Sequence, residues 1–402
     1  MDEKSLKPQL RFKGFTEAWE QRKLGDIMDV TSVKRIHQSD WQTEGIRFLR
    51  ARDIVSAIKN EDPEDCLYIS KEKYEEYSKI SGKVEIGDLL VTGVGTIGVP
   101  YLIINSEPIY FKDGNIIWFK NKKNINGKFL YFSFTNNKIQ NFIKESAGTG
   151  TVGTYTIESG KKTPIFLPHN DEQNKIANFF SNLDNLITLH QRKLDKLSNV
   201  KKALLEKMFP KNDSDVPEIR FKGFTEAWEQ RKLEDCAQIT MGQSPAGTTY
   251  TDTPSGYILV QGNADLENGW VKPRIWTTQV TKKADAGDLI MSVRAPAGTM
   301  GKTAYNVVLG RGVAGIKGNE FLFHILVKMD VNGFWKKLSC GSTFASLNSD
   351  NIKNAEIKTP EILEQQKIGT FFSNLDNLIT LHQRKLEKLK NIKKACLEKM
   401  FV

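Results

Sequence analysis

The sequence predicts an α+β protein in which two pseudo-symmetric, strand-rich mixed α/β domains are joined by two long helices that form an antiparallel coiled coil. Two duplications carry this prediction. The opening segment Arg11–Leu24 recurs letter for letter as Arg220–Leu233. The closing segment Glu172–Phe209 recurs as Glu364–Phe401, with 31 of 38 positions identical. The 402 residues are therefore two copies of one module, each with a variable body between shared ends.

Each closing segment has the pattern of a long amphipathic helix. In the first copy, apolar residues fall at steps of three and four from Ile176 to Met208, with no Gly or Pro between them. Such a helix would be roughly 55 Å long. Two such helices most simply bury their stripes against each other, and a pseudo-twofold relation between the modules makes them antiparallel. The residues expected at the seam are Leu183, Leu186, His190, Leu194, Leu197, Leu375, Leu378, His382, Leu386 and Leu389. We interpret the two histidines as polar markers of register.

The repeats also set the expected domain boundaries. A polar stretch between Pro210 and Pro217 stops the first helix and forms a linker. The expected segments are a first domain at 1–168, a first long helix at 169–209, the linker at 210–217, a second domain at 218–360 and a second long helix at 361–402. Gly87–Thr92 in the first body corresponds to Gly287–Ser292 in the second, so we expect one fold with different surface residues.

Composition narrows the class of protein. Lys and Arg number 58 against 48 Asp and Glu, a net charge of +10, which favours a polyanionic partner such as nucleic acid. Seven of these ten excess charges lie in the two closing segments. No run of residues is apolar enough for a membrane span or a signal peptide, so we expect a cytoplasmic protein. The four cysteines form no C-x-x-C pair, which argues against a zinc site or a disulfide framework.

The sequence contains near matches to catalytic motifs, but none is complete. Gly93–Gly98 has the spacing G-x-G-x-x-G, yet the residues after it do not open a helix, as a dinucleotide site requires. Gly301–Thr303 resembles the end of a P-loop, but Pro296 stands where the first glycine should be. The target-base motif of amino-methyltransferases is absent, as are H-E-x-x-H and G-x-S-x-G. We therefore expect no catalytic residue and no metal ligand.

The two-module layout resembles the specificity subunit of type I restriction-modification enzymes over essentially the whole chain, in the style of low-GC Gram-positive bacteria. The resemblance is carried by motifs that occur twice in the same order. They are the Phe-Lys-Gly-Phe-Thr-Glu-Ala-Trp-Glu-Gln-Arg-Lys-Leu opening and the Glu-Gln-x-Lys-Ile helix start followed by Phe-Phe-Ser-Asn-Leu-Asp. Single-copy motifs add to it: Gly287-Asp-Leu-Ile, Ser292-Val-Arg-Ala-Pro296, Gly310-Arg-Gly312 and Gly341-Ser-Thr343.

The resemblance implies a division of labour. Each variable body would be a target recognition domain for one half of a bipartite, asymmetric site in double-stranded DNA. The paired helices would set the spacer between the halves and dock two modification (methyltransferase) subunits. The resemblance places S-adenosylmethionine on those subunits, which methylate adenine, and ATP-driven translocation and cleavage on restriction subunits. ATP and Mg²⁺ are thus expected on partner subunits and no cofactor on this chain.

The DNA-contacting residues that we expect are polar or cationic and lie in loops, where side chains can meet base edges and phosphates. Glycine-rich loops suit this role because their backbone can approach DNA closely. In the first domain the candidates are Lys34, Arg35, Arg50, Arg52, Thr92, Thr96, Thr149, Thr151 and Tyr155. In the second they are Gln243, Ser244, Gln261, Asn263, Arg294, Lys302, Arg311, Ser342, Thr343 and Phe344.

Two other classes of function stay open on the sequence alone. A non-catalytic coiled-coil scaffold or adaptor would keep the helices, but it would not need two divergent bodies on identical frames. A stand-alone DNA methyltransferase or nuclease would need a cofactor loop or acidic metal ligands, and the sequence shows neither pattern. Salt-sensitive DNA binding would distinguish the scaffold from the specificity subunit.

Overall fold

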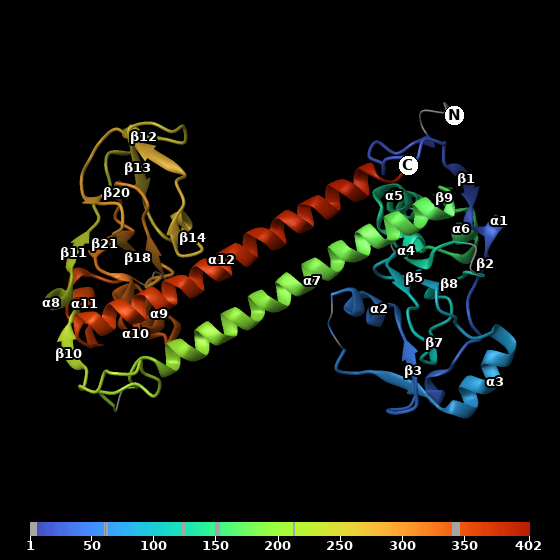
Figure 1. Cartoon of the computed structure of the whole chain (residues 1–402), viewed down its shortest axis with the longest axis horizontal. Coiled ribbons are helices and arrows are strands. Elements are labelled where there is room, and N and C mark those ends of the chain that lie inside the picture. Colours follow the sequence, from blue (N-terminus) through green and yellow to red (C-terminus); the bar gives the residue numbers. More distant parts are fainter. Residues whose placement is uncertain are drawn as a thin grey trace. The chain divides into compact units, whose positions relative to one another are not determined.

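The computed structural model describes residues 6–59, 61, 63–122, 125–148, 153–211, 214–339 and 346–402. The chain divides into two compact units (Figure 1). The first unit is Met1–Leu189 with Leu386–Val402, and the second is His190–Lys385. Each unit therefore holds one variable body and a part of each long helix. Within the described residues, no helix is both long enough and apolar enough to cross a membrane.

The two predicted long helices are confirmed (Figure 1, green and red). Their bounds are α7 (Asn170–Lys207) and α12 (Ile362–Lys399). In the first unit, Asp184 near the start of α7 pairs with Lys393 near the end of α12, at 2.5 Å. In the second unit, Lys201 of α7 pairs with Asp376 of α12. The two helices thus run antiparallel in each unit, as predicted.

The seam between the helices differs from the prediction at two positions. Leu183, Leu375 and Leu386 are buried, while His190, Leu194, Leu197, His382 and Leu389 are half-buried. Leu186 and Leu378, however, are 43% and 47% exposed, so their assignment to the seam was wrong. The buried and half-buried positions follow alternating steps of four and three through Ile187 and Ile379. Leu186 and Leu378 each lie one residue off that pattern and therefore turn toward solvent.

The two seam histidines contact each other directly. Nδ1 of His190 lies 2.8 Å from Nδ1 of His382, so one ring donates a hydrogen bond to the other. Burial, His190 and the nearby Lys193 and Lys385 lower the pKa of His382. This pair fixes which turn of α7 faces which turn of α12 in the second unit.

The body of the first unit contains two small sheets and a ribbon. The strand orders are β2-β8-β5-β6, β4-β3-β7 and β1-β9. The strand bounds are β1 (Glu20–Lys23), β2 (Asp29–Thr31), β3 (Ile46–Leu49), β4 (Leu67–Ile69), β5 (Leu89–Thr92), β6 (Pro100–Leu102), β7 (Ile109–Phe111), β8 (Ile116–Lys120) and β9 (Pro164–Leu167). The helices are α1 (Leu24–Ile27), η2 (Gln38–Asp40), α2 (Ala51–Ile58), α3 (Lys71–Ser81), α4 (Gly127–Thr135), α5 (Asn137–Ser146) and α6 (Ile157–Lys162).

The body of the second unit repeats this plan with extra strands. Its orders are β11-β21-β18-β19-β15-β14, β12-β16-β13-β20-β17 and β10-β22. The strand bounds are β10 (Glu229–Lys232), β11 (Gln238–Met241), β12 (Tyr250–Thr251), β13 (Tyr257–Val260), β14 (Leu266–Glu267), β15 (Trp270–Val271), β16 (Ile275–Thr277), β17 (Lys283–Ala284), β18 (Leu289–Ser292), β19 (Met300–Lys302), β20 (Val307–Leu309), β21 (Val313–Lys317) and β22 (Glu356–Thr359). The helices are α8 (Leu233–Cys236), η3 (Gly247–Thr249), η4 (Asn263–Asp265), α9 (Glu320–Val331), α10 (Phe334–Leu338) and α11 (Ser349–Lys353).

Each opening segment is fastened to the start of a long helix by a bidentate ion pair. Arg11 donates from Nε and Nη2 to the carboxylate of Glu172, each at 2.7 Å. Arg220 makes the same pair with Glu364, each at 2.8 Å. Both glutamates are buried, at 1% and 0% exposure. A carboxylate in the first turn also suits the helix dipole.

Each opening segment, together with the residue just before it, also holds the end of the other long helix. In the first unit, Leu10 N–H donates to the carbonyl of Lys399, and buried Trp19 meets Phe401 edge-on. In the second unit, Ile219 N–H donates to the carbonyl of Lys207, and Trp228 meets Phe209 in the same way. One short segment thus joins both long helices to the body of each unit.

We predict that the Arg–Glu pair is essential to the unit that contains it. R220A leaves the carboxylate of Glu364 buried without its partner, which costs about 3–5 kcal/mol. Hydrogen exchange should therefore accelerate throughout the second unit, with the first unit as the internal reference. R231A, which breaks an exposed pair with Glu229, is the matched control and should change exchange little. Unchanged protection of the second unit in R220A would contradict the prediction.

The cores of the two units differ at a buried histidine. His324 of α9 is fully buried against Phe372, in the place that Phe132 of α4 takes against Phe180 in the first unit. Neither ring nitrogen of His324 has a hydrogen-bond partner. Burial, with smaller contributions from Lys201 and Lys302, lowers the pKa of His324 to about 2. The imidazole is therefore neutral in the folded protein across the physiological range.

We predict that His324 makes the second unit sensitive to acid. Below about pH 6.5 the unfolded chain binds a proton at this histidine and the folded chain does not, so stability falls by about 1.4 kcal/mol per pH unit. H324F reproduces the residue of the first unit and should remove this contribution. Urea unfolding at pH 7.5 and pH 5 should show a stability difference between H324F and wild type that grows in acid. A difference independent of pH would contradict this.

Candidate nucleic-acid interface

One parallel strand pair in each unit brings two loops to the same sheet edge. β3 runs parallel to β7, with Leu49 opposite Phe111, and β13 runs parallel to β20, with Val260 opposite Leu309. Because parallel strands end on the same side, the segments that follow them emerge next to each other. We call residues 34–35, 50–53, 65–66 and 112–115 the first-unit edge. We call residues 243–244, 261–265, 274 and 310–312 the second-unit edge.

A buried aspartate organises the second-unit edge. Asp265, at 3% exposure, accepts hydrogen bonds from the backbone N–H of Gln261 at 2.7 Å and of Gly262 at 3.2 Å. The neighbouring loop is held by Arg311 N–H, which donates to Ser244 Oγ at 3.0 Å. The structure thus brings together five of the residues expected to contact DNA: Gln243, Ser244, Gln261, Asn263 and Arg311.

Glycine is required where these loops cross. A Cβ added to Gly312 would collide with the carbonyl oxygen of Gln261, and a Cβ added to Gly242 would collide with that of Gly310. Both positions therefore accept only glycine without movement of the loops. This tight crossing gives the second-unit edge a defined shape, with exposed Gln243 and Arg311 on its outside.

In the first-unit edge, arginines are bound to carboxylates. Arg50 donates from Nε and Nη2 to buried Asp53, at 3.0 and 2.9 Å, and from Nη1 to Asp65 at 3.2 Å. Asp53 raises the pKa of Arg50, and Arg50 lowers the pKa of the Asp65 carboxyl. The side chain of Arg50 is only 15% exposed. Arg50 therefore shapes this edge from inside rather than offering a free side chain.

Three cations of the first-unit edge face solvent. Arg52, 58% exposed, pairs with Asp65, and Arg35, 68% exposed, lies 3.3 Å from Asp113. The amine of exposed Lys34 lies over the ring of Tyr77 at 4.2 Å. These contacts orient the side chains and leave them accessible to a polyanion.

Three residues expected to contact DNA are buried instead, and we remove them from the candidate set. The hydroxyl of Thr92 is fully buried on β5 and donates to the carbonyl of Thr96. Tyr155 is 1% exposed, its hydroxyl shares a hydrogen bond with Thr163, and burial raises its pKa. Lys302 is 7% exposed and bound to Glu320 at 2.9 Å. Their sheets and cores enclose them, although the sequence around them resembles loops.

The other expected residues divide by position. Thr96 and Arg294 are exposed in the loops that follow β5 and β18. Ser292 Oγ donates to the carbonyl of Arg294, and Val293 N–H donates to that of Gly312, so Arg294 adjoins the second-unit edge. Five residues lie outside the described part of the chain: Thr149, Thr151, Ser342, Thr343 and Phe344.

Sequence reasoning missed the two buried aspartates and Arg274. Nε of Arg274 donates to Asp265 at 2.9 Å, and its side chain is 50% exposed. Asp53 and Asp265 each lie three residues after a backbone N–H that they accept from, at Arg50 and Gly262. This spacing is a capping signal that is visible in the sequence. The pairing of Arg274 with Asp265 depends on the strand register, which the sequence alone does not define.

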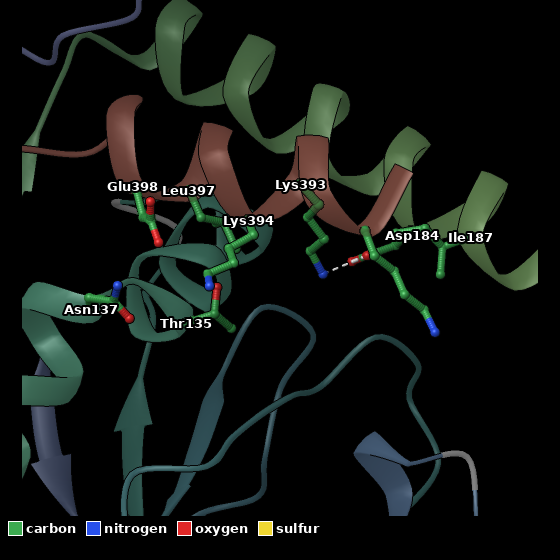
Figure 2. A pocket seen from close by; sticks show the side chains of 9 residues that line it. Thr135, Asn137, Asp184, Ile187, Lys393, Lys394, Leu397 and Glu398 are labelled. Atoms are coloured by element: carbon green, nitrogen blue, oxygen red, sulfur yellow. Dashed lines mark ion pairs between the residues drawn. The ribbon is translucent and has the colours of Figure 1, made fainter. Parts of the chain in front are cut away.

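The described residues also form several pockets, including one in the first unit. Figure 2 shows a pocket of about 390 Å³ between the end of α12, α7 and the α4–α5 junction. Lys390, Lys393 and Lys394 line it, together with Asp184 and Glu398. The ion pair of Lys393 with Asp184 crosses it. Charges of both signs therefore line this pocket.

The chemistry of the described residues is that of recognition. Both edges offer amide and guanidinium groups, and the second-unit edge adds the hydroxyl of Ser244; such groups can meet phosphates and base edges. Within the described part of the chain, no group of three or more His, Cys, Asp or Glu residues could hold a metal ion. The two edges differ in charge and shape, whereas the ion pairs that fasten the opening segments are the same.

These features define a protein of two similar units with a different polar loop edge in each, and comparison with known proteins identifies the family. The chain belongs to the type I restriction modification DNA specificity domain family, which matches residues 16–199 and 225–391. A putative type I restriction enzyme MjaX specificity subunit of Methanocaldococcus jannaschii is 27% identical over 402 residues, covering 94% of this chain and 91% of that protein.

Solved structures support the same fold. The S subunit of a type I restriction-modification system from M. genitalium superposes with a TM-score of 0.66 at 14% identity, covering 98% of this chain and 99% of the other. A chain from a study of complex assembly and conformational transition of the type I R-M system gives 0.55 at 20% identity, over 94% and 96%. The predicted fold class is thereby confirmed.

Proposed function

We propose that each unit recognises one half of a bipartite, asymmetric site in double-stranded DNA, and that this chain supplies the sequence specificity of a type I restriction-modification complex. One observation carries the proposal. The chain belongs to a family of DNA specificity domains, and its two units share their frame, meaning the opening segments and the long helices. They differ at the same loop edge. The first edge presents Arg52 and Asp65, whereas the second presents Gln261, Asn263 and Arg274. Two different surfaces on one frame suit two different half-sites.

The exposed cations of the edges suit phosphate contacts. Lys34, Arg35 and Arg52 in the first unit, and Arg294 and Arg311 in the second, would fix the register of each unit on the duplex. Gln243, Gln261 and Asn263 are amides and suit adenine edges in the major groove. A scaffold without DNA binding would need none of these side chains at the same edge.

The proposal extends to partners. Two modification subunits would bind S-adenosylmethionine and methylate adenine, and restriction subunits would use ATP and Mg²⁺, while this chain catalyses nothing. The long helices, which carry most of the excess positive charge, would set the spacer and dock the modification subunits. The complex would act in the cytoplasm. Incubating the purified chain with DNA, Mg²⁺ and S-adenosylmethionine tests for a stand-alone methyltransferase or nuclease.

We predict that exchanging the body between Leu24 and Glu172 for that of a relative changes one half-site only. The fastening residues Arg11 and Glu172 stay in place, so the second unit and the helices keep their structure. Sequencing of methylated adenine motifs in cells that contain the modification subunits measures the outcome. The same exchange in the second body, between Leu233 and Glu364, is the matched control and should change the other half-site. Alteration of both halves by one exchange would contradict the proposal.

We also predict that the helices set the spacer length. Inserting seven residues at the middle of both α7 and α12 restores the four-three pattern of the seam and lengthens each helix by about 10 Å. At about 3.4 Å per base pair, the spacer of the methylated motif should grow by roughly three base pairs. The half-sites should be unchanged. Methylation that keeps the original spacer would contradict a role of the helices in spacing.

A further inference from the structure

Arg274 lies at the second-unit edge because of strand register. It precedes β16, which pairs antiparallel with β13 so that Ile275 is opposite Leu259. Arg274 therefore emerges beside the end of β13, where Gln261 begins the loop toward Asp265. It is thus adjacent to residues already expected to contact DNA, although it comes from a different segment of the chain.

The guanidinium of Arg274 is held on one side and open on the other. Its Nε donates to Oδ1 of Asp265 at 2.9 Å, and the other oxygen of Asp265 accepts the N–H groups of Gln261 and Gly262. Asp265 is 3% exposed, so it is a fixed anchor. Among the described residues, no hydrogen bond or ion pair occupies Nη1 or Nη2 of Arg274. With the side chain 50% exposed, two parallel donors remain available.

The first unit shows the closed version of this arrangement. Asp53 corresponds to Asp265 as the buried aspartate after the parallel strand, but its partner is Arg50. Asp65, just before β4, occupies the remaining donors of Arg50 with its carboxylate and its carbonyl. The second unit places Arg274 itself just before the matching strand, β16. The buried aspartate thus binds an arginine in both units, but the donors of Arg50 are occupied in the first unit, whereas those of Arg274 stay accessible in the second.

We propose that Arg274 contacts a guanine in the half-site bound by the second unit, and that Asp265 is the positioning residue that aims it. This inference rests on the proposed function of the second unit. A planar pair of donors matches the O6 and N7 acceptors of guanine in the major groove, the commonest specific contact of arginine. A buried carboxylate on Nε restricts rotation of the guanidinium, so the two donors are ordered before DNA binds.

The test is the methylated motif of R274Q and D265N in cells that contain the modification subunits. In wild type, one half-site should contain a required guanine. R274Q should reduce the preference for that base by about 10- to 100-fold and leave the other half-site unchanged. D265N should reduce the preference for the same base, because Asp265 acts by positioning Arg274. A purely structural role of Asp265 would instead weaken the whole half-site.

Two further variants keep the outcome decisive. R231Q removes an exposed arginine that also donates from Nε to a carboxylate, Glu229, but lies on β10 rather than at the second-unit edge. It is the matched control and should leave the motif unchanged. R274K keeps the charge but lacks the two parallel donors. If R274Q does not fold, R274K decides the matter: the methylated motif either loses the requirement for guanine, as proposed, or keeps it.

Failure of this inference can be distinguished from failure of the proposed function. If the methylated motif disappears when this chain is deleted, yet R274K and R274Q retain every base, the guanine contact is wrong and the proposed function stands. A half-site for the second unit without guanine overturns the contact in the same way. If deletion of this chain leaves the methylated motif unchanged, the proposed function itself fails.

Discussion

The architecture of each unit depends on one buried ion pair, between the opening arginine and the first-turn glutamate of a long helix. A buried ion pair is costly to form and far costlier to break on one side, so it specifies geometry more than it adds stability. Here it ties the first turn of a long helix to the opening segment of the body. The tryptophan of the same segment packs on the end of the other helix. Body and helices therefore hold one arrangement whatever the loops contain.

This separation explains how two bodies of different sequence share one frame. The residues that fasten the frame lie in the repeated segments, and the residues at the edges lie in the variable bodies. The second unit even adds strands to both of its sheets without disturbing the parallel pair that forms its edge. Specificity can then diverge in one unit while the other unit and the helices are unaffected.

Residue patterns predicted the frame better than the edges. Over 38 residues, the helical period of apolar residues leaves little doubt which face of the helix is buried. Only Leu186 and Leu378, which lie one residue away from the seam positions, were assigned to the seam wrongly. Thr92 and Lys302 were predicted to contact DNA, but they lie on strands β5 and β19 and are buried there. Arg274 could not be found because its partner Asp265 reaches it only through the register of β16 on β13.

The two joints between opening segments and helices show what holds each unit together. In the second unit the end of α7 and the opening segment are consecutive in the chain, connected by the residues after Lys207. In the first unit the same joint, of α12 with the segment beginning at Leu10, is made without a chain connection. Yet the backbone hydrogen bond is 2.9 Å long in both, and the aromatic contact recurs. The joint is therefore maintained by packing and hydrogen bonding, and the peptide linker is not what orients the second body.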